Sequence, residues 1–287
     1  MSQRKTASTL QVERLEPGAR NVLRDRVAVE EPMEVRVETV LEGRTSTRSI
    51  SVTMRTPGHD FELAAGFLFS EGILERREDI REITYCQTGE LQEYNVVTVR
   101  FREGLVLNPD LVNRNFYTTS SCGVCGKGSL EAVQVRGCQV IPDGTLSVEA
   151  RILPRLPELL LEGQKGFRRT GGLHAAGLFD PLGEMESLRE DVGRHNAVDK
   201  IVGHALLEEK VPLGDRILVV SGRTSFEILQ KAVAAGVPVV VAVGAPSTLA
   251  VELARKFNVT LIGFARGQRF NLYAGGGRVR DWEGERE

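Results

Sequence analysis

Ile217-Leu218-Val219-Val220 is an apolar run that predicts a buried strand, and two similar runs follow it, Val239 to Val243 and Val259 to Ile262. None of the three runs alternates apolar with polar residues, so each is expected to form a strand that is buried on both faces. Helix patterns separate the runs, the first from Ser225 to Ala235. Buried strands that alternate with helices form a parallel sheet, so residues 216–263 are predicted to be a βαβαβ unit with right-handed crossovers.

The helices carry their own start signals. Thr224 and Glu227 have the capping-box spacing, and Ser247 can cap the helix that follows the second strand. Upstream, apolar residues recur at helical spacing from Val198 to Leu206, with Asn196 as a plausible cap.

The first third of the chain has a different pattern. Apolar and polar residues alternate in Val35 to Thr39, Ile50 to Met54 and Val97 to Phe101, which predicts strands with one buried face. Asp60 can cap a short helix from Phe61 to Ser70. This part therefore reads as a small α+β unit.

We predict an α/β protein in three parts. Residues 1–20 are polar and patternless, and are expected to be a mobile tail. A smaller N-terminal α+β domain follows at 21–115, and a C-terminal α/β domain occupies 116–287.

Composition excludes several classes of protein. The 287 residues hold 37 Lys plus Arg and 39 Asp plus Glu, a formal charge of −2, so there is no basic field for nucleic acid. The longest apolar stretch, Val237 to Val243, is far shorter than the ~20 residues of a membrane span. No signal peptide pattern opens the chain, so a cytoplasmic location is expected.

The four cysteines include one close pair, Cys122 and Cys125, inside the segment Ser120 to Gly128. Glycines flank Cys125, and the residues that follow can be helical. A helix N-terminus and the nearby Lys127 would both lower the pKa of a thiol, which favours the nucleophilic thiolate. The pair therefore suits sulfur or disulfide chemistry.

Two other uses of the pair stay open. Zinc commonly binds a C-x-x-C pair, but it wants four ligands, and the chain has no second close pair, so His174 or His195 would have to be recruited. Thioredoxin-like redox chemistry is the other option, although the flanking pattern differs from that of thioredoxin-like proteins.

Two glycine-rich stretches, Gly171 to Gly177 and Glu190 to Asn196, hold His174, Arg194 and His195. Loops at the ends of strands and helices carry function, so these side chains are site candidates. The alternative is that they cap helices and satisfy buried backbone groups.

A third candidate follows the first parallel strand, where Gly222, Arg223 and Thr224 open a helix. Free helix N–H groups, hydroxyls and an arginine together make an anion site, although a capped helix with a surface arginine would look the same. A companion stretch follows the third strand: Phe264, Ala265, Arg266, Gly267, Gln268 and Arg269. Both stretches lie at carboxyl ends of parallel strands, where α/β sheets bind ligands.

Several motifs occur in one order along the chain. They are Thr56-Pro57-Gly58, Glu62 to Leu68, Ser120 to Gly126, Asp191 to Lys200 and Ser221-Gly222-Arg223. In this order they resemble the formate dehydrogenase accessory sulfurtransferase family (FdhD), from about residue 27 to residue 275.

The resemblance implies a fold and an activity. The larger domain would resemble cytidine deaminase, which by itself implies no deamination. The protein would carry sulfur from a cysteine desulfurase to the molybdenum or tungsten bis-molybdopterin guanine dinucleotide cofactor before its insertion into formate dehydrogenase. The sulfur would travel as a persulfide on Cys122, with Cys125 as partner, and the cofactor would bind at 264–269.

Residue chemistry and resemblance agree on a phosphate-bearing ligand. Pyrophosphates of the cofactor would meet Arg223, Arg266 and Arg269, and GDP would be a partial mimic. A zinc-dependent hydrolase of nucleotide-like substrates is the alternative function. The sequence leaves open whether the chain forms a homodimer.

Overall fold

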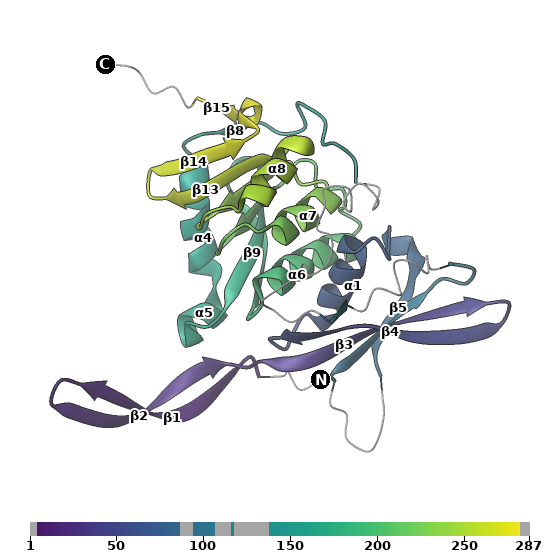
Figure 1. Cartoon of the computed structure of the whole chain (residues 1–287), viewed down its shortest axis with the longest axis horizontal. Coiled ribbons are helices and arrows are strands. Elements are labelled where there is room, and N and C mark those ends of the chain that lie inside the picture. Colours follow the sequence, from purple (N-terminus) through teal and green to yellow (C-terminus); the bar gives the residue numbers. More distant parts are fainter. Residues whose placement is uncertain (1–4, 87–93, 107–115, 118–137, 282–287) are drawn as a thin grey trace.

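The computed structural model describes residues 5–86, 94–106, 116–117 and 138–281 (Figure 1). Cys122 and Cys125 lie outside these described residues. Within the described part of the chain, no helix is both long and apolar enough to cross a membrane.

The central sheet has six strands in the order β10-β9-β11-β12-β13-β14. Its middle strands β11 (Ile217–Val220), β12 (Val239–Ala242) and β13 (Thr260–Arg266) are parallel neighbours. Helices α7 (Phe226–Ala234) and α8 (Thr248–Lys256) connect them. The predicted βαβαβ unit is therefore confirmed.

Antiparallel strands extend this unit on both sides. On one side β9 (His174–Phe179) pairs with β11, and β10 (Met185–Asp191) pairs with β9. On the other side β14 (Arg269–Ala274) pairs with β13. The sheet is thus mixed, with its parallel part in the centre.

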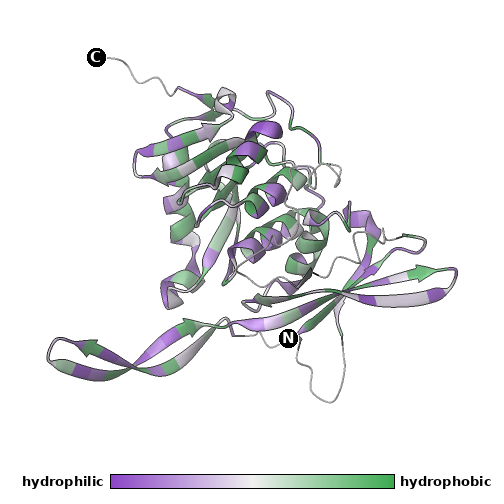
Figure 2. Cartoon of the chain, in the orientation of Figure 1, coloured by the Kyte–Doolittle hydropathy of each residue, from purple (hydrophilic) through white to green (hydrophobic). Residues whose placement is uncertain are grey.

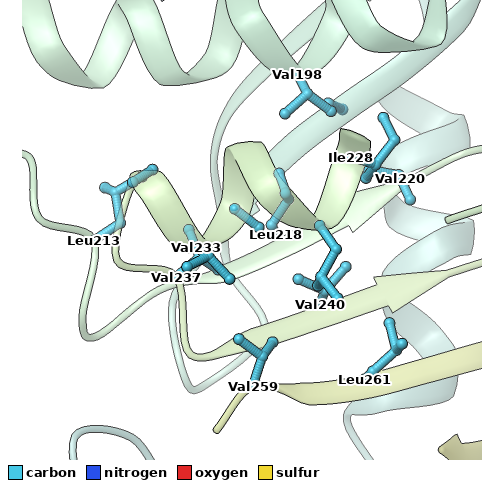
Figure 3. Close-up of a cluster of buried hydrophobic side chains, with 14 of the residues drawn as sticks. Val198, Leu213, Leu218, Val220, Ile228, Val233, Val237, Val240, Val259 and Leu261 are labelled. Carbon is cyan, nitrogen blue, oxygen red and sulfur yellow. The ribbon is translucent and has the colours of Figure 1, made fainter. Parts of the chain in front are cut away.

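Helices cover both faces of the sheet, giving three layers. On one face α6 (Arg194–Leu207), α7 and α8 pack against strand residues such as Leu218 and Val240, which are fully buried (Figure 3). On the other face lie η2 (Leu153–Arg155) and α4 (Leu156–Gly163). Three shorter elements lie at the margins of this part: α5 (Lys165–Thr170), the paired strands β8 (Val148–Glu149) and β15 (Val279–Arg280), and η3 (Gly276–Arg278).

The N-terminal part is a five-stranded sheet in the order β5-β6-β3-β4-β7 with one packed helix, α1 (Asp60–Ser70). The first two predicted strands are confirmed, and they pair as an antiparallel hairpin of β3 (Glu31–Leu41) and β4 (Arg44–Arg55). The other elements are η1 (Arg77–Asp79), β5 (Ile80–Tyr85), β6 (Val96–Phe101) and β7 (Phe116–Tyr117).

Helices α1 and α6 join the two parts through a glycine contact. A Cβ atom on Gly66 would lie 1.9 Å from the carbonyl oxygen of Asp199, and one on Gly203 would lie 1.8 Å from that of Glu62. Only glycine allows the two backbones to approach this closely. Leu206 of α6 belongs to the buried cluster of the N-terminal sheet, so the two parts share core contacts.

The prediction of a patternless tail at 1–20 is wrong for residues 7–16. Strands β1 (Ala7–Glu16) and β2 (Ala19–Ala28) form an antiparallel hairpin of ten paired positions. This arm extends away from the body of the molecule, with polar and apolar residues mixed along it (Figures 1 and 2). None of the residues of β1 and β2 is buried, so no core imposes a continuous apolar face on their sequences.

Three helix starts differ from the predicted caps. Ser225, not Thr224, caps α7, and its hydroxyl accepts a hydrogen bond from the backbone N–H of Ile228. Helix α6 begins at Arg194, so Asn196 lies inside it. Asp60 is not a cap either, because its carboxylate is buried against Arg55. The predicted cap at Ser247 is confirmed.

Candidate functional site

The carboxyl edge of the parallel strands is where the predicted anion-binding stretches meet. Here the carboxyl edge means the ends of β11, β12 and β13 and the residues that follow them. The backbone N–H of Gly244 donates to the carbonyl of Gly222 (3.1 Å), and that of Phe264 donates to the carbonyl of Gly244 (3.3 Å). The loop after β12 therefore lies between the two predicted stretches and holds them together.

Arg223 packs closely on this middle loop. A Cβ atom on Gly244 would lie 3.1 Å from the Cα and N atoms of Arg223, so glycine gives the space for the approach. The Arg223 side chain is exposed, whereas the neighbouring Thr224 is buried. The hydroxyl oxygen of Thr224 has no hydrogen-bond partner among the described residues.

Residues 264–269 do not follow the third strand, as the sequence predicted, but form its end and a hairpin turn. Strand β13 continues to Arg266, whose backbone pairs with that of Arg269, and Gly267 lies in the turn with a φ of 61°. Phe264 is 47% exposed, with a φ of 52°, while Ala265 is buried. The exposed side chains of Phe264, Arg266, Gln268 and Arg269 are thus available to a ligand, and Ala265 offers only its backbone.

His195 lies at the same edge, in the first turn of α6. Its Nε2 is 3.2 Å from the hydroxyl of Ser225, and its Nδ1 is 3.2 Å from the carboxylate of Glu227. Burial lowers the pKa of His195 to about 3, and Lys231 and Arg194 add to the effect because nearby cations disfavour a charged ring. The ring is therefore neutral at pH 7, and its contact with Glu227 is a hydrogen bond donated by Nδ1 rather than an ion pair.

His174 begins β9 beside the Gly222 turn. A Cβ atom on Gly222 would lie 3.4 Å from Nδ1 of His174. Burial lowers the pKa of His174, and the cation of Arg194 lowers it further. The Nε of Arg194 is buried with no partner among the described residues. The structure thus brings His174, Arg194 and His195 together near Gly222.

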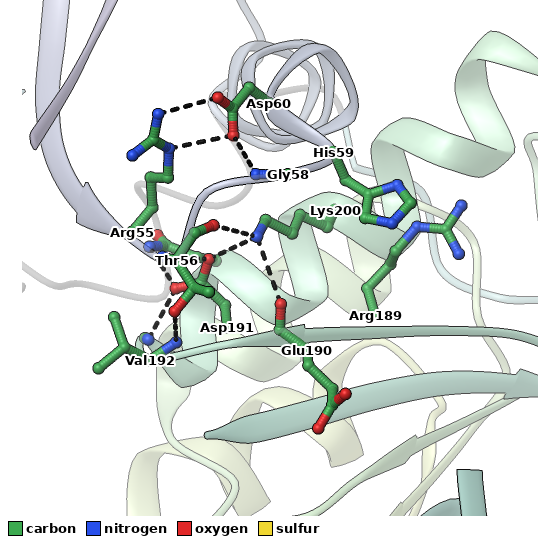
Figure 4. Close-up of polar contacts among 12 residues, drawn as sticks. Arg55, Thr56, Gly58, His59, Asp60, Arg189, Glu190, Asp191, Val192 and Lys200 are labelled. Atoms are coloured by element: carbon green, nitrogen blue, oxygen red, sulfur yellow. Dashed lines mark hydrogen bonds and ion pairs between the residues drawn. The ribbon is translucent and has the colours of Figure 1, made fainter. Parts of the chain in front are cut away.

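A buried network of hydrogen bonds and an ion pair connects the carboxyl edge to the N-terminal part (Figure 4). The ammonium of Lys200 is 2.7 Å from the carboxylate of Asp191 and donates to the carbonyl of Thr56 (2.9 Å). Asp191 also accepts from the backbone N–H of Thr56 (3.1 Å), and Asn196 donates to it (3.0 Å). Because Asp191 and Lys200 are fully buried, their ion pair and hydrogen bonds hold the two parts in register.

A second buried pair lies deeper. Lys231 of α7 and Asp199 of α6 are 2.8 Å apart, and Ser70 of α1 donates to the same carboxylate (3.1 Å). Neither buried pair was predicted from the sequence. Asp199 and Lys200 lie outside the apolar stripe of the predicted helix, where charged residues are expected to be exposed, so the pattern gave no signal of their burial.

The predicted catalytic residues Cys122 and Cys125 lie outside the described residues, so their roles stay predictions. Among the side chains that the structure describes, no three His, Cys, Asp or Glu converge as metal ligands would. The two described cysteines, Cys86 and Cys138, are half-buried.

Fold and site define a class of protein. It is a mixed α/β protein whose parallel strands end at an edge rich in exposed arginine, and buried ion pairs connect its central sheet to a smaller sheet. Residues 28–280 match the model of the FdhD/NarQ family. The chain belongs to that family.

Curated relatives and a solved structure agree with this assignment. The "Sulfur carrier protein FdhD" of Streptomyces avermitilis is 48% identical over 270 residues, which is 93% of each chain. That of Mycobacterium tuberculosis is 48% identical over 264 residues, covering 89% of this chain and 92% of its own. The crystal structure of a Desulfotalea psychrophila protein, described as a formate dehydrogenase accessory protein, has a TM-score of 0.72 at 24% identity. It covers 96% of this chain and 100% of its own, and it supports the fold.

Proposed function

We propose that this protein is a sulfurtransferase that takes sulfur from a cysteine desulfurase and passes it to a bis-molybdopterin guanine dinucleotide cofactor of molybdenum or tungsten. The loaded cofactor would then enter formate dehydrogenase, and the work would take place in the cytoplasm. The observation that carries the proposal is the match to curated sulfur carrier proteins over 93% of the chain. We also propose that the larger domain resembles the cytidine deaminase fold.

Cys122 is the proposed carrier. Its thiolate attacks the outer sulfur of a persulfide on the desulfurase, so the donor S–S bond breaks and a new S–S bond forms on Cys122. The donor leaves as a thiolate, and no external oxidant is needed. Cys125 is the proposed partner that receives or steadies the sulfur.

Chain connectivity supports a meeting of this thiol with the carboxyl edge. Strand β7 runs parallel to β4, with Tyr117 opposite Val52, and therefore points toward Thr56. Cys122 follows Tyr117 by five residues, which can span at most about 17 Å. Thr56 follows Val52 by four residues, about 13 Å along an extended chain, and contacts Asp191, whose register partner is His174.

The carboxyl edge is the proposed place for the nucleotide ends of the cofactor. Its pyrophosphates would be held by the exposed guanidinium groups of Arg223, Arg266 and Arg269. The unpartnered buried polar atoms of Arg194 and Thr224 support a polar ligand at this edge, because buried polar groups normally have partners. GDP would occupy part of the site, and neutral His174 would hydrogen-bond to the cofactor. His195 would do so by exchanging its contact with Ser225 for one with the cofactor.

The test is to load the protein with sulfur and locate it. Incubation with a cysteine desulfurase and cysteine should add the mass of one sulfur atom to the intact chain, and peptide mapping should place it on Cys122. Cys122→Ala should remain folded and take up no sulfur, whereas the matched variants Cys86→Ala and Cys138→Ala should load normally. Sulfur on Cys86 or Cys138 instead would overturn the assignment.

A further inference from the structure

A cavity of about 600 Å³ lies between the two parts of the molecule, away from the arginines of the carboxyl edge. We call it the Thr56 cavity, because the Thr56-Pro57-Gly58 turn forms one wall. Strand β10 and helix α5 form the opposite wall, and Thr6, just before the hairpin arm, closes one side. Its volume is that of a site for a small organic molecule.

The Thr56 cavity carries two cations without carboxylate partners. Lys165 and Arg169 lie one turn apart on α5, both are exposed, and neither pairs with an acidic side chain in the part of the chain described. The other lining cations differ: Lys200 is bound to Asp191, and Arg189 is bound to Glu62.

The one carboxylate in the lining does not neutralise these two cations directly. The side-chain oxygens of Glu190 accept hydrogen bonds from the backbone N–H groups of Gly166 and Phe167, both at 2.7 Å. Glu190 is therefore committed to the start of α5. An anionic group entering the cavity would find Lys165 and Arg169 as its donors.

Aromatic rings form the other end of the cavity. Tyr85 and Tyr94 meet edge to face, with ring centroids 5.1 Å apart. Tyr85 is fixed by a hydrogen bond to Asp60 (3.2 Å), and Tyr94 is 40% exposed at a strained φ of 54°. An exposed ring held in place offers a stacking surface for a flat ligand.

We propose that the Thr56 cavity is a second binding site, separate from the carboxyl edge, for a flat-ringed organic anion such as a ring-bearing phosphate monoester. The phosphate binds Lys165 and Arg169, and the ring packs on Tyr94. The Thr56-Pro57-Gly58 motif, which the carboxyl edge does not use, thereby has a role as cavity wall. The buried Asp191–Lys200 pair separates the Thr56 cavity from the carboxyl edge, because Lys200 lines the cavity and Asp191 pairs with His174 at the edge.

Two phosphorylated probes and their neutral parents test the site: flavin mononucleotide with riboflavin, and GMP with guanosine. Fluorescence quenching for the flavins and calorimetry for the purines should show that at least one phosphorylated member of a pair binds, and more tightly than its parent. Comparison of the two pairs identifies the preferred ring.

Charge-removing variants separate this cavity from the rest of the surface. The double variant Lys165→Gln/Arg169→Gln should weaken binding of the phosphorylated probe by about tenfold or more, since charged hydrogen bonds are lost. The control is Arg168→Gln, an exposed cation on the same helix that does not line the cavity. It should bind like the wild type.

Three results would overturn the proposal. The first is that neither phosphorylated probe binds at millimolar concentration. The second is that the double variant and Arg168→Gln bind a probe equally well. The third is that Arg223→Ala removes the binding of flavin mononucleotide, which would assign that binding to the carboxyl edge. Circular dichroism of each variant shows whether its fold is intact, and Tyr94→Leu, which removes the aromatic surface and no charge, gives an independent check.

Discussion

Replacing Gly203 by alanine should force helices α1 and α6 apart. The added Cβ would lie 1.8 Å from the carbonyl oxygen of Glu62, a backbone atom that cannot rotate away. Helices α1 and α6 would have to separate by more than about 1 Å to reach the 3.0 Å below which real Cβ contacts essentially never occur.

The free energy of unfolding should fall by about 2 kcal/mol or more. Overpacking of a core typically costs about 1–3 kcal/mol, and backbone atoms on both sides put this site at or above the upper end. Alanine is a better helix former than glycine by about 1 kcal/mol, which offsets part of the cost. The separation would also stretch the hydrogen bonds that Thr56 makes with Asp191 and Lys200.

Urea unfolding followed by circular dichroism measures the effect. The matched control is Gly214→Ala, where an added Cβ meets no atom within 4 Å and φ is not positive, so stability should change by less than about 1 kcal/mol. Gly66→Ala should act like Gly203→Ala, and the double variant should cost less than the sum, because the first alanine has already opened the gap. If Gly203→Ala unfolds at the same urea concentration as Gly214→Ala, the close helix contact is refuted.

Three further predictions concern the site. Lys200→Met leaves the carboxylate of Asp191 buried without its cation and should cost about 3–5 kcal/mol in unfolding free energy; a loss below about 1 kcal/mol in urea unfolding would contradict this. His195 should stay neutral from pH 5 to 8 by NMR, because its folded pKa is about 3. In the unfolded chain the ring of His195 is protonated below pH ~6.5, so the contribution of neutral His195 to the free energy of unfolding is present above that pH and is lost as the pH falls toward 3. Titration of the ring near pH ~6.5 in the folded protein would refute the burial argument. Arg223→Ala should weaken GDP binding in calorimetry, with a smaller difference at high salt because exposed charges are screened, and equal affinities would remove Arg223 from the site.

The central sheet could be predicted because its strands are buried on both faces. The runs at 217–220, 239–243 and 259–262 contain almost only apolar residues, and few arrangements other than a covered parallel sheet bury them. The antiparallel strands β9, β10 and β14 were not predicted. Strand β9 is buried, but half of its residues are alanine or glycine, which are uncommon in strands. Strands β10 and β14 form the two edges of the sheet, and their exposed positions mix polar and apolar residues.

Helix caps were predicted to within three residues, and the reasons for the differences are local. Thr224 and Ser225 can both cap in principle. The backbone N–H of Thr224 is bonded to the carbonyl of Ala245, which leaves Ser225 as the first residue free to cap. Asp60 has a cap's side chain, but its carboxylate pairs with Arg55 at the end of β4, and the helix pattern does not show that Arg55 is buried.

The meeting of residues at the carboxyl edge was partly predictable. The ends of parallel strands share one side of a sheet, so Arg223 and Phe264 had to lie on the same side, although β12 and its Gly244 loop separate them. The buried pairs Asp191–Lys200 and Asp199–Lys231 could not be paired from sequence, because charged residues are usually exposed and their partners lie on different elements.

The hairpin arm, which consists of β1 and β2, is expected to unfold locally and to be cleaved by proteases before the rest of the molecule. A two-stranded ribbon with exposed residues on both faces is only marginally stable in water. Its ladder therefore opens at little cost, while β11, buried on all sides, opens only when the whole protein unfolds. Backbone amides of the arm should exchange with deuterium first, and a protease should nick the Pro17-Gly18 tip before it reaches any other paired strand.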